Sequence, residues 1–313
     1  MCNGFARWFP RVSINALLLW AFWTLATNLK LVPTVLAIFI GAPTLVITTL
    51  AVAAYNMVWI NGPGSPKDFP ILLTSMEEDV PEAIKFGATA KRDGGFRYCS
   101  KCCVWKPDRS HHCSSCRECR LRMDHHCPWF TACIGFNNHK HFVQFLWYVA
   151  ILAALSAFLG WIIILNWFGA GSYNSEFMDI NLLLFSILAT VFAVAVTAFG
   201  TYTTWQAANN ATTLETLEKS ATTWRTSLPA AHYRFKEAPT MATLGNLWDM
   251  GTMENLNQVL GRTWAEWLLP INARHPRGFD GTVWPVDERL QEIAEERAVV
   301  ERSLLSRHYS ERF

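Results

Sequence analysis

The sequence predicts an all-α membrane protein, with four transmembrane helices and a small cytosolic zinc-binding cysteine-rich domain between helices two and three. The 313-residue chain is 51% hydrophobic and only 17% charged, whereas globular proteins average about 25% charged residues. Four long stretches contain no Asp, Glu, Lys or Arg, and eight of the nine cysteines lie between the second and third stretches. The net charge of +2, without a long basic run, gives no indication of nucleic-acid binding.

The charge-free stretches have the length of membrane-spanning helices. A bilayer core of about 30 Å requires about 20 apolar residues in a helix, whereas helices of soluble proteins average about 11–12 residues. Buried helices of a soluble core therefore explain these stretches less well. The four stretches are Val12 to Leu29, Leu31 to Ile60, Phe142 to Ser175 and Ile180 to Leu214, the last losing its apolar character near Gly200.

The first stretch could also be a signal peptide, with Arg7 and Arg11 at its charged start. Its 18 uncharged residues exceed the roughly 7–15 of a signal-peptide core, and it lacks a small-residue cleavage site, so we expect a membrane anchor. In the second stretch, Pro33 and Pro43 are compatible with a membrane helix whose neighbours satisfy the freed backbone groups. We expect both prolines to bend this helix.

The distribution of basic residues predicts the orientation in the membrane. Segment 61–141 contains twelve Lys and Arg, and twelve more follow Gly200, whereas the two other links together contain only Lys30. Because Lys and Arg are enriched in cytoplasmic loops, we expect both termini and segment 61–141 in the cytosol. The expected parts are 1–60 for helices one and two, 61–141 for the cytosolic segment with its cysteine-rich domain at about 97–141, 142–204 for helices three and four, and 205–313 for a cytosolic tail.

The cysteines of the cytosolic segment are spaced for metal binding. Disulfides are rare in the reducing cytosol, and a pair such as Cys99-x2-Cys102 places two thiolates on one tight loop, which suits tetrahedral zinc. Two closed sites need eight ligands, and the cysteines and histidines together exceed that number, so at least one thiol should be free. The candidate metal ligands are Cys99, Cys102, Cys103, Cys113, Cys116, Cys119, Cys127, Cys133, His112, His125 and His126.

Cys127 is the best candidate for the free thiol, because it directly follows Asp124, His125 and His126. A thiol becomes a good nucleophile when a base such as a neighbouring imidazole removes its proton. A carboxylate bound to the other ring nitrogen would fix the tautomer and stabilise the charged ring. The run therefore predicts a nucleophilic cysteine, with the alternative that Cys127 is a further structural ligand.

The complete pattern resembles the cysteine-rich domain of the DHHC protein S-acyltransferases. It reads Cys99-x2-Cys102-x9-His112-Cys113-x2-Cys116-x2-Cys119-x4-Asp124-His125-His126-Cys127-x5-Cys133, followed by Pro128-Trp129, Gly135, Asn137-Asn138 and Phe142. Two later segments are similar to the TTxE motif and the C-terminal motif of that family. They are Thr212-Thr213-Leu214-Glu215, and Asn255 to Gly261 with Trp267 to Pro270; Glu266 stands where the family often has an aromatic residue.

The resemblance implies palmitoyl transfer from acyl-CoA to protein cysteines by a ping-pong reaction. Cys127 would be the nucleophile, His125 its base, and Asp124 the group that orients His125. The resemblance also implies two structural zinc ions with crossed ligand sets. One ion would bind Cys99, Cys102, His112 and Cys119, and the other Cys113, Cys116, His126 and Cys133.

The same resemblance implies the partners and the location. The partners would be acyl-CoA, the lipid bilayer, and cytosolic or membrane-associated proteins with accessible cysteines, without nucleic acid. The fungal family members associated with the vacuole are the most similar in length and tail. We therefore expect a multi-pass protein of an endomembrane, either the vacuole or the Golgi and endoplasmic reticulum.

We expect two further contacts with acyl-CoA. Lys106, Arg109 and His111 lie beside the zinc framework and could bind coenzyme phosphates, although a basic strip facing solvent or lipid headgroups is an equal alternative. A C16 chain of about 20 Å spans roughly 13 residues of a membrane helix, which places its end near Leu152. The alternative is that the small residues beside Leu152 pack against a neighbouring helix.

Two other functions fit part of the sequence. In a membrane-anchored zinc-binding adaptor or ubiquitin ligase, every Cys and His would be structural. The run from Asp124 to Cys127 and the TTxE-like motif argue against that function. An inactive family member that escorts a partner is the other alternative, and incubation with labelled acyl-CoA would distinguish the three.

Overall fold

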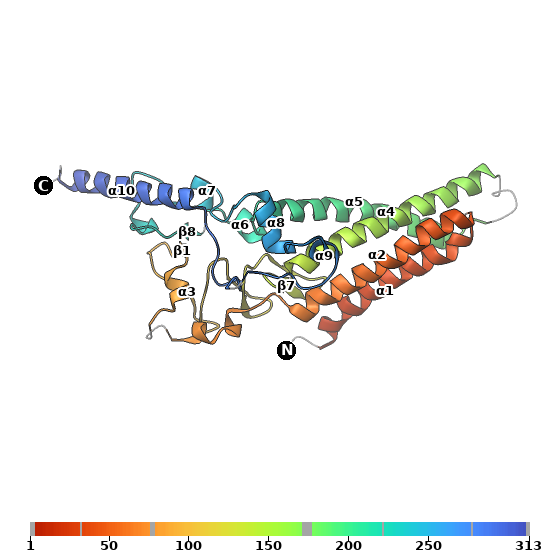
Figure 1. The fold of residues 1–313 in the computed structure, drawn as a ribbon, viewed down its shortest axis with the longest axis horizontal. Helices are drawn as coiled ribbons and strands as arrows, with labels where there is room; N and C mark the ends of the chain where they lie inside the picture. Colours follow the sequence, from red (N-terminus) through yellow and green to blue (C-terminus); the bar gives the residue numbers. More distant parts are fainter. Residues whose placement is uncertain are drawn as a thin grey trace.

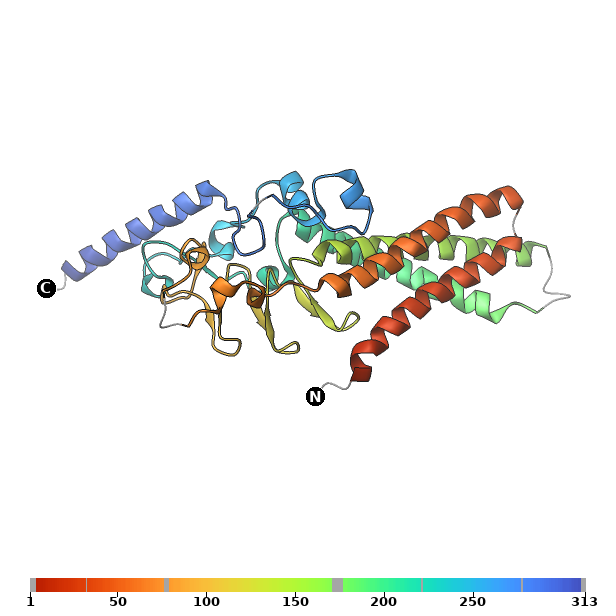
Figure 2. The same ribbon diagram turned by 60° about the horizontal axis from the view of Figure 1, so that its bottom comes forward.

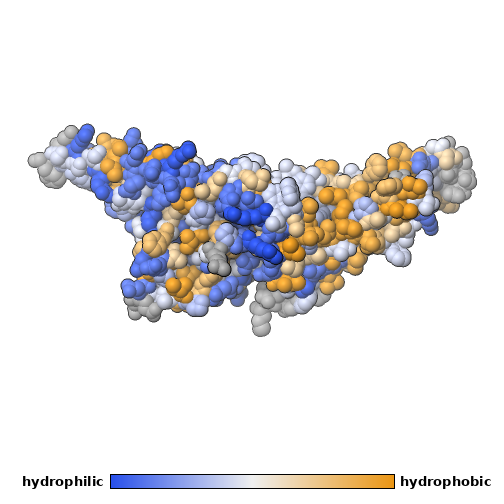
Figure 3. Space-filling view, viewed as in Figure 1, coloured by the Kyte–Doolittle hydropathy of each residue, from blue (hydrophilic) through white to orange (hydrophobic). Residues whose placement is uncertain are grey.

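A computed structural model describes residues 4–31, 33–75, 79–170, 177–220, 222–276 and 278–310. The molecule is elongated, with a bundle of long helices at one end and the cysteine-rich segment and the tail at the other (Figure 1). Hydrophobic residues cover the helical end of the face shown in Figure 3, and hydrophilic residues dominate the opposite end. This division is the one expected for a bundle in lipid that carries a domain in water.

Four helices are long and apolar enough to cross a membrane, over residues 8–31, 37–61, 139–169 and 180–208. The prediction of an all-α membrane part with four spans and a cysteine-rich domain between spans two and three is confirmed, and the chain is a multi-pass membrane protein. The helices are α1 (Gly4–Asn28), α2 (Thr34–Asn61), α4 (His139–Gly169) and α5 (Ile180–Ala208), with a short 3-10 helix η1 (Leu29–Leu31) after α1.

Helix α4 lies at the centre of the bundle and contacts the three other long helices. Its closest approach to α5 is at Gly160, where an added Cβ atom would lie 2.1 Å from Oγ of Ser186. Small residues allow membrane helices to approach in this way, where dispersion and not water exclusion holds them together. The buried core of the bundle includes Leu18, Leu25, Ala51, Ala54, Leu152, Leu159 and Phe185.

The expectation that Pro33 and Pro43 both bend the second helix is wrong for Pro33. Helix α2 begins at Thr34 with Pro33 as its N-cap, so Pro33 lies outside the helix. A proline at a helix start costs nothing, because the first N–H groups of a helix have no intrahelical partner. Pro43 does lie inside α2, where it removes one backbone hydrogen bond.

The cysteine-rich segment folds into three antiparallel hairpins, which Figure 2 shows one after another between the short helix α3 (Glu82–Lys85) and the start of α4. The all-α description therefore holds for the membrane part only. Two 3-10 helices, η2 (Pro66–Asp68) and η3 (Pro70–Leu73), precede α3. The hairpins are β2 (Tyr98–Cys99) with β3 (Val104–Trp105), β4 (His111–Cys113) with β5 (Glu118–Arg120), and β6 (His125–Cys127) with β7 (Ala132–Ile134).

The tail after α5 returns to the cysteine-rich segment. Its strand β8 (Thr223–Trp224) pairs with β1 (Thr89–Ala90), which lies before the hairpins. Helix α8 packs against α4 and α5. The remaining tail elements are α6 (Thr213–Leu217), η5 (Ala230–His232), α7 (Met241–Leu244), α8 (Thr252–Leu260), α9 (Trp264–Leu268) and α10 (Glu288–Ser310).

Helix α10 is fixed to the tail by one buried carboxylate. Glu301 is fully buried, and its two oxygens accept the backbone N–H groups of Arg234, Phe235 and Lys236 at 2.5–2.8 Å. A second acidic residue, Glu295, accepts the N–H of Ser227 at 2.9 Å. Because a buried charge is stable only when it is fully hydrogen-bonded, these contacts hold the charged helix against the residues that follow β8.

Candidate active site

Cys127 lies at the end of β6 that faces the helical bundle. Its side chain is 6% exposed and belongs to an apolar cluster that includes Tyr55 of α2 and Phe142 of α4. Helix α2 also holds the turn that follows Cys127: Tyr55 Oη donates to the carbonyl of Trp129 at 3.0 Å, and Trp59 Nε1 donates to that of Phe130 at 2.7 Å. The thiol therefore lies where the hairpins meet the membrane helices.

His125 connects this thiol to a carboxylate. Its Nδ1 lies 2.7 Å from Oδ2 of Asp124, so Nε2 is the ring nitrogen available to Cys127. Burial alone would lower the pKa of His125, but hydrogen bonds and charges of Asp124 and Cys127 outweigh it and raise the pKa to about 9. The ring is therefore a strong base for the thiol proton. Phe142 supports it edge-on, with the ring centroids 5.3 Å apart.

Asp124 is held from its other side by the tail. The backbone N–H of Thr213 donates to Oδ1 at 2.8 Å, and the Thr213 hydroxyl donates to Oδ2 at 3.0 Å. Burial would raise the pKa of Asp124, but the hydrogen bonds from His125 and Thr213 hold it well below its usual value. A carboxylate that accepts several hydrogen bonds stays ionised even when buried. Asp124 therefore faces His125 as a fixed negative charge.

The TTxE-like motif is fixed by an ion pair with the segment before the second hairpin. Thr212 and Glu215 form a capping box at the start of α6. Both oxygens of Glu215 accept hydrogen bonds from the guanidinium of Arg109 at 2.8 Å. The remaining donors of Arg109 reach the side-chain and backbone oxygens of Asn210 at 2.8 and 2.7 Å. This bidentate geometry is the strong form of an ion pair, and it fixes the loop that presents Thr213.

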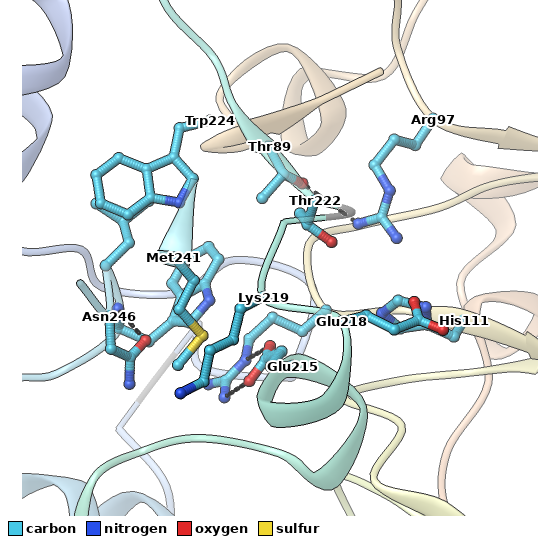
Figure 4. A pocket seen from close by; sticks show the side chains of 13 residues that line it. Thr89, Arg97, His111, Glu215, Glu218, Lys219, Thr222, Trp224, Met241 and Asn246 are labelled. Carbon is cyan, nitrogen blue, oxygen red and sulfur yellow. Dashed lines mark hydrogen bonds and ion pairs between the residues drawn. The ribbon is translucent and has the colours of Figure 1, made fainter. Parts of the chain in front are cut away.

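This ion pair argues against Arg109 as a contact for coenzyme phosphates. Its guanidinium is buried, is committed to Glu215 and Asn210, and packs over the ring of Trp284 at 4.6 Å. His111 is no better suited, because burial and the charge of Arg97 lower its pKa to about 4 and leave it neutral. Figure 4 shows that His111, Glu215 and Lys219 line the same small polar pocket. The third expected phosphate contact, Lys106, is half-buried and stays a prediction.

Two clusters of side chains could each hold a metal ion. The donor atoms within each cluster lie within 4.8 Å of one another. The shortest sulfur–nitrogen distances are 3.2 Å from Cys102 to Nδ1 of His112, and 3.4 Å from Cys116 to Nδ1 of His126. Ligands about 2.0–2.3 Å from a tetrahedral ion are spaced in this range, so the donor sets fit zinc. The clusters are Cys99, Cys102, His112 and Cys119, and Cys113, Cys116, His126 and Cys133.

The three hairpins repeat every fourteen residues, and this repeat explains why Cys127 lies outside both clusters. Cys127 occupies the position of Cys99 and Cys113, which are the first ligands of the two clusters. The next ligand position of the third hairpin, however, is Phe130 instead of a cysteine. The two positions further along that would complete the set are Lys140 and Trp147. The third hairpin therefore keeps one thiol without the three partners that a closed site needs.

The turns of the hairpins follow the same repeat. Cys103, Arg117 and Thr131 are the equivalent turn residues, and each has a positive φ between 47° and 56°. A left-handed conformation is unusual for residues with a side chain, so its recurrence at one position shows that the third hairpin has the backbone shape of the metal-binding pair. The free thiol is thus presented by a zinc-knuckle backbone.

Leu152 lies in an apolar pocket within the bundle, between α1, α4 and α5. The pocket has about 450 Å³ of empty space, part of it open to the surroundings of the bundle, and Leu17, Trp20, Ser156 and Phe192 also line it. Leu152 itself is buried. Phe142, Leu146 and Leu152 follow one another along α4 inside the two adjoining apolar clusters. Buried apolar side chains therefore line α4 between Cys127 and the pocket.

Several residues at the site did not stand out in the sequence. The TTxE-like motif contains Thr213 but predicts no role for it, and no sequence pattern marks Asn210 or Arg122. Arg122 donates to Nδ1 of His139 at 2.6 Å and to Oδ1 of Asn210 at 3.3 Å. Burial and the nearby charge of Arg109 lower the pKa of Arg122 to about 9. The contacts from Arg122 to Asn210 and from Asp124 to Thr213 join segments about 90 residues apart, which a local sequence pattern does not show.

The C-terminal motif anchors the tail to the bundle. Asn255 is buried, donates to the carbonyl of Ala208 at the end of α5, and accepts from the N–H of Met250. Glu266, which departs from the family pattern, is also buried, and its oxygens accept the backbone N–H groups of Arg262, Thr263 and Arg274. Glu266 therefore holds the loop around α9 by hydrogen bonds, which an aromatic side chain at this position could not form.

Comparisons with known proteins identify relatives over nearly the whole chain. Residues 93–220 match the family model described as DHHC palmitoyltransferase. The chain is 36% identical to palmitoyltransferase PFA3 of Yarrowia lipolytica, over 94% of this chain and 80% of the relative. It is 35% identical to palmitoyltransferase PFA3 of Saccharomyces cerevisiae over 96% and 91%, and 34% identical to that of Eremothecium gossypii over 100% and 98%.

Replacing either of the two adjacent histidines, His125 and His126, should affect the zinc content of the protein differently. We expect His126→Ala to lose one of two bound zinc ions, because Nδ1 of His126 faces three thiols of its cluster. His125→Ala should keep both ions, since its Nδ1 is engaged with Asp124. Structural zinc contributes about 10–16 kcal/mol of binding free energy in small peptides, so the first variant should also unfold more readily. Equal zinc content in the two purified variants would contradict the ligand sets.

Proposed function

The chain belongs to the DHHC palmitoyltransferase family, and from that premise we propose that Cys127 carries the palmitoyl group from acyl-CoA to the cysteines of substrate proteins. The chain is a protein-cysteine S-palmitoyltransferase. The observation that supports Cys127 as its nucleophile is the hydrogen-bonded series from Thr213 through Asp124 and His125 to a thiol outside both metal clusters.

In the first half-reaction, His125 Nε2 takes the proton of the Cys127 thiol. The thiolate attacks the thioester carbonyl of acyl-CoA, the carbon–sulfur bond to the coenzyme breaks, and the coenzyme sulfur leaves with the proton that His125 held. Asp124 stabilises the imidazolium throughout, because its charge is fixed 2.7 Å from Nδ1. General-base assistance of this kind is typically worth about 10²–10⁴-fold in rate.

The second half-reaction repeats these steps with a protein thiol. His125 takes the proton of a substrate cysteine, whose thiolate attacks the acyl group on Cys127. The bond to Cys127 breaks, and the Cys127 sulfur recovers the proton. One thioester replaces another in each half, so the overall driving force is small and the enzyme's task is to position and deprotonate the two thiols.

Zinc in the two clusters would act on structure and not on the acyl group. The eight ligands lie on the three hairpins, the last of which is formed by β6 and β7. In the sequence, His126 lies between the base His125 and the nucleophile Cys127. A bound ion fixes the strand on which all three lie. Because structural zinc sites are closed by four protein ligands, neither ion would have an open position for the thioester.

The arrangement also suggests where acyl-CoA binds. The acyl chain would follow the buried apolar side chains of α4 from Phe142 to the pocket at Leu152, a rise of about 15 Å over ten helical residues. The charged coenzyme would stay outside the bundle, near Lys106. Transfer at the membrane surface would spare the apolar chain from water, and it would favour substrate cysteines on membrane-associated or cytosolic proteins.

We place both termini and the cysteine-rich segment in the cytosol. The start of α1, the hairpins and the tail lie at the same end of the bundle (Figure 1), and the excess of Lys and Arg on that end favours the cytosolic side. The organelle is proposed from family likeness alone, as an endomembrane such as that of the vacuole or of the Golgi and endoplasmic reticulum.

Cys127→Ser should abolish both acylation of the enzyme and transfer to substrate, because the serine hydroxyl is not deprotonated near neutral pH. The variant should still bind two zinc ions. Cys103→Ser is the matched control, since Cys103 is an exposed thiol of the first hairpin and belongs to neither cluster. Labelled palmitoyl-CoA and hydroxylamine release measure the thioester. Acylation that persists in Cys127→Ser would show that the nucleophile is another residue, and zinc loss in that variant would show that Cys127 is a metal ligand instead.

Leu152→Trp should shift the preferred acyl chain from C16 towards C14 or shorter, by about tenfold in relative rate, because a fused ring pair would fill the pocket. Ile151→Trp is the control, since Ile151 is the neighbouring residue on the exposed face of α4. Competition among acyl-CoA chain lengths gives the ratio directly. The same profile in both variants and the parent would place the acyl chain elsewhere.

A further inference from the structure

A polar pocket lies where α2 ends and α4 begins, at the end of the bundle that carries the hairpins. It holds about 660 Å³ of empty space and is lined by Asn61, Asn137, Lys140, His141, Asn272 and His275. Neither Cys127 nor a metal ligand lines it. Amide and basic side chains from the end of α2, the start of α4 and the tail thus converge at a place apart from Cys127 and from both metal clusters.

Lys140 supplies a positive charge to this pocket without a matching negative one. Its side chain is 4% exposed, and its Nζ has no hydrogen-bond partner in the described part of the chain. Glu266 is the acidic group whose charge acts on Lys140, but its oxygens already accept the N–H groups of Arg262, Thr263 and Arg274. A buried ammonium is costly without a partner, which indicates that an anion completes the site.

The start of α4 adds to the same preference. No side chain among the described residues caps this helix, and its first turn contains no acidic residue. Asn138, the N-cap residue, uses its amide on the carbonyls of Val58 and Cys133 and on the N–H of Gly135 instead. Lys140 and His141, in the first turn of α4, line the pocket, so the positive end of the helix dipole lies beside it, an arrangement that binds phosphate in many proteins.

The remaining lining groups can donate hydrogen bonds. His141 Nε2 lies 3.3 Å from Oδ1 of Asn272, and the amide of Asn61 donates to the same oxygen at 2.7 Å. His275 stacks on Phe136, with the ring centroids 5.2 Å apart, and this contact fixes the direction of its ring. Because the amide of Asn61 and the ring of His141 are engaged with Oδ1 of Asn272, the groups that remain to donate to the oxygens of a phosphate are the amide N–H groups of Asn272 and the ring of His275.

Exposed apolar residues next to the pocket identify the source of the phosphate. Ile60 precedes Asn61 at the end of a membrane helix and is 68% exposed, and Ile271 precedes Asn272 and is 46% exposed. Leu268 and Leu269 are exposed on the same loop. Acyl-CoA and a membrane lipid both combine a phosphate with an apolar part, and the position of these residues at the end of a membrane helix favours the lipid. We propose that this pocket binds the phosphate of an anionic phospholipid at the membrane surface.

Lipid retention by the purified full-length protein tests this site. Parent, Lys140→Met and Arg274→Met are placed in phosphatidylcholine nanodiscs with and without phosphatidic acid, and retained lipid is counted by native mass spectrometry. Arg274 is the matched control, because it is an exposed cation of the adjoining loop that does not line the pocket. We expect Lys140→Met to weaken retention of phosphatidic acid about five- to tenfold, as loss of one membrane-surface cation predicts, and Arg274→Met to behave like the parent.

The Michaelis constant for palmitoyl-CoA in pure phosphatidylcholine distinguishes the two sources of phosphate. We expect it to change less than about twofold in Lys140→Met. A raised constant with unchanged lipid retention would assign the phosphate to the coenzyme and overturn the lipid site. Equal loss of lipid in both Met variants, or loss in neither, would also overturn it. If Lys140→Met does not fold, His275→Phe, which keeps the stack on Phe136, takes its place with the same expected loss.

Discussion

The site depends on one buried carboxylate that two distant parts of the chain share. Asp124 faces His125 in its own hairpin and Thr213 in the tail, 89 residues further along. A buried, ionised carboxylate is stable only while it accepts enough hydrogen bonds, so the tail must be docked for the base to be oriented. The Arg109–Glu215 pair and Asn255 hold the tail in that position, which makes catalytic geometry a property of the assembled molecule.

The position of the proposed nucleophile, Cys127, follows from the arrangement of the hairpins. Three backbones of the same shape succeed one another every fourteen residues, and the first two place their leading thiol in a metal cluster. In the third, Phe130 replaces the second thiol and packs between Tyr55 and Phe142. The same substitution removes Cys127 from metal chemistry and connects it to the apolar cluster of the bundle. One metal-supported framework therefore yields both rigidity and a free thiol at the membrane.

The features that the sequence predicts well are those carried by local pattern. Charge-free length predicts the four spans, and the spacing of Cys and His identifies residues that the structure brings together in two clusters. Pairing across long distances was not readable: nothing in the sequence shows that Thr213 reaches Asp124 or that Arg109 is buried against Glu215. From the sequence alone, Arg109 is a reasonable phosphate contact, and only its pairing with Glu215 in the structure argues against that role. Similarly, the sequence does not show where α2 begins, so it does not show that Pro33 lies outside this helix.

The rate at which Cys127 is acylated in Thr213→Val, compared with Thr213→Ser, tests the dependence on the shared carboxylate most directly. Valine keeps the backbone N–H and removes the hydroxyl that donates to Asp124, whereas serine keeps both. A hydrogen bond to a charged group contributes about 1.5–3 kcal/mol, so we predict a fall of about tenfold or more for valine. Serine should remain close to the parent, with two zinc ions bound in each. Equal acylation rates for valine, serine and the parent would contradict the account.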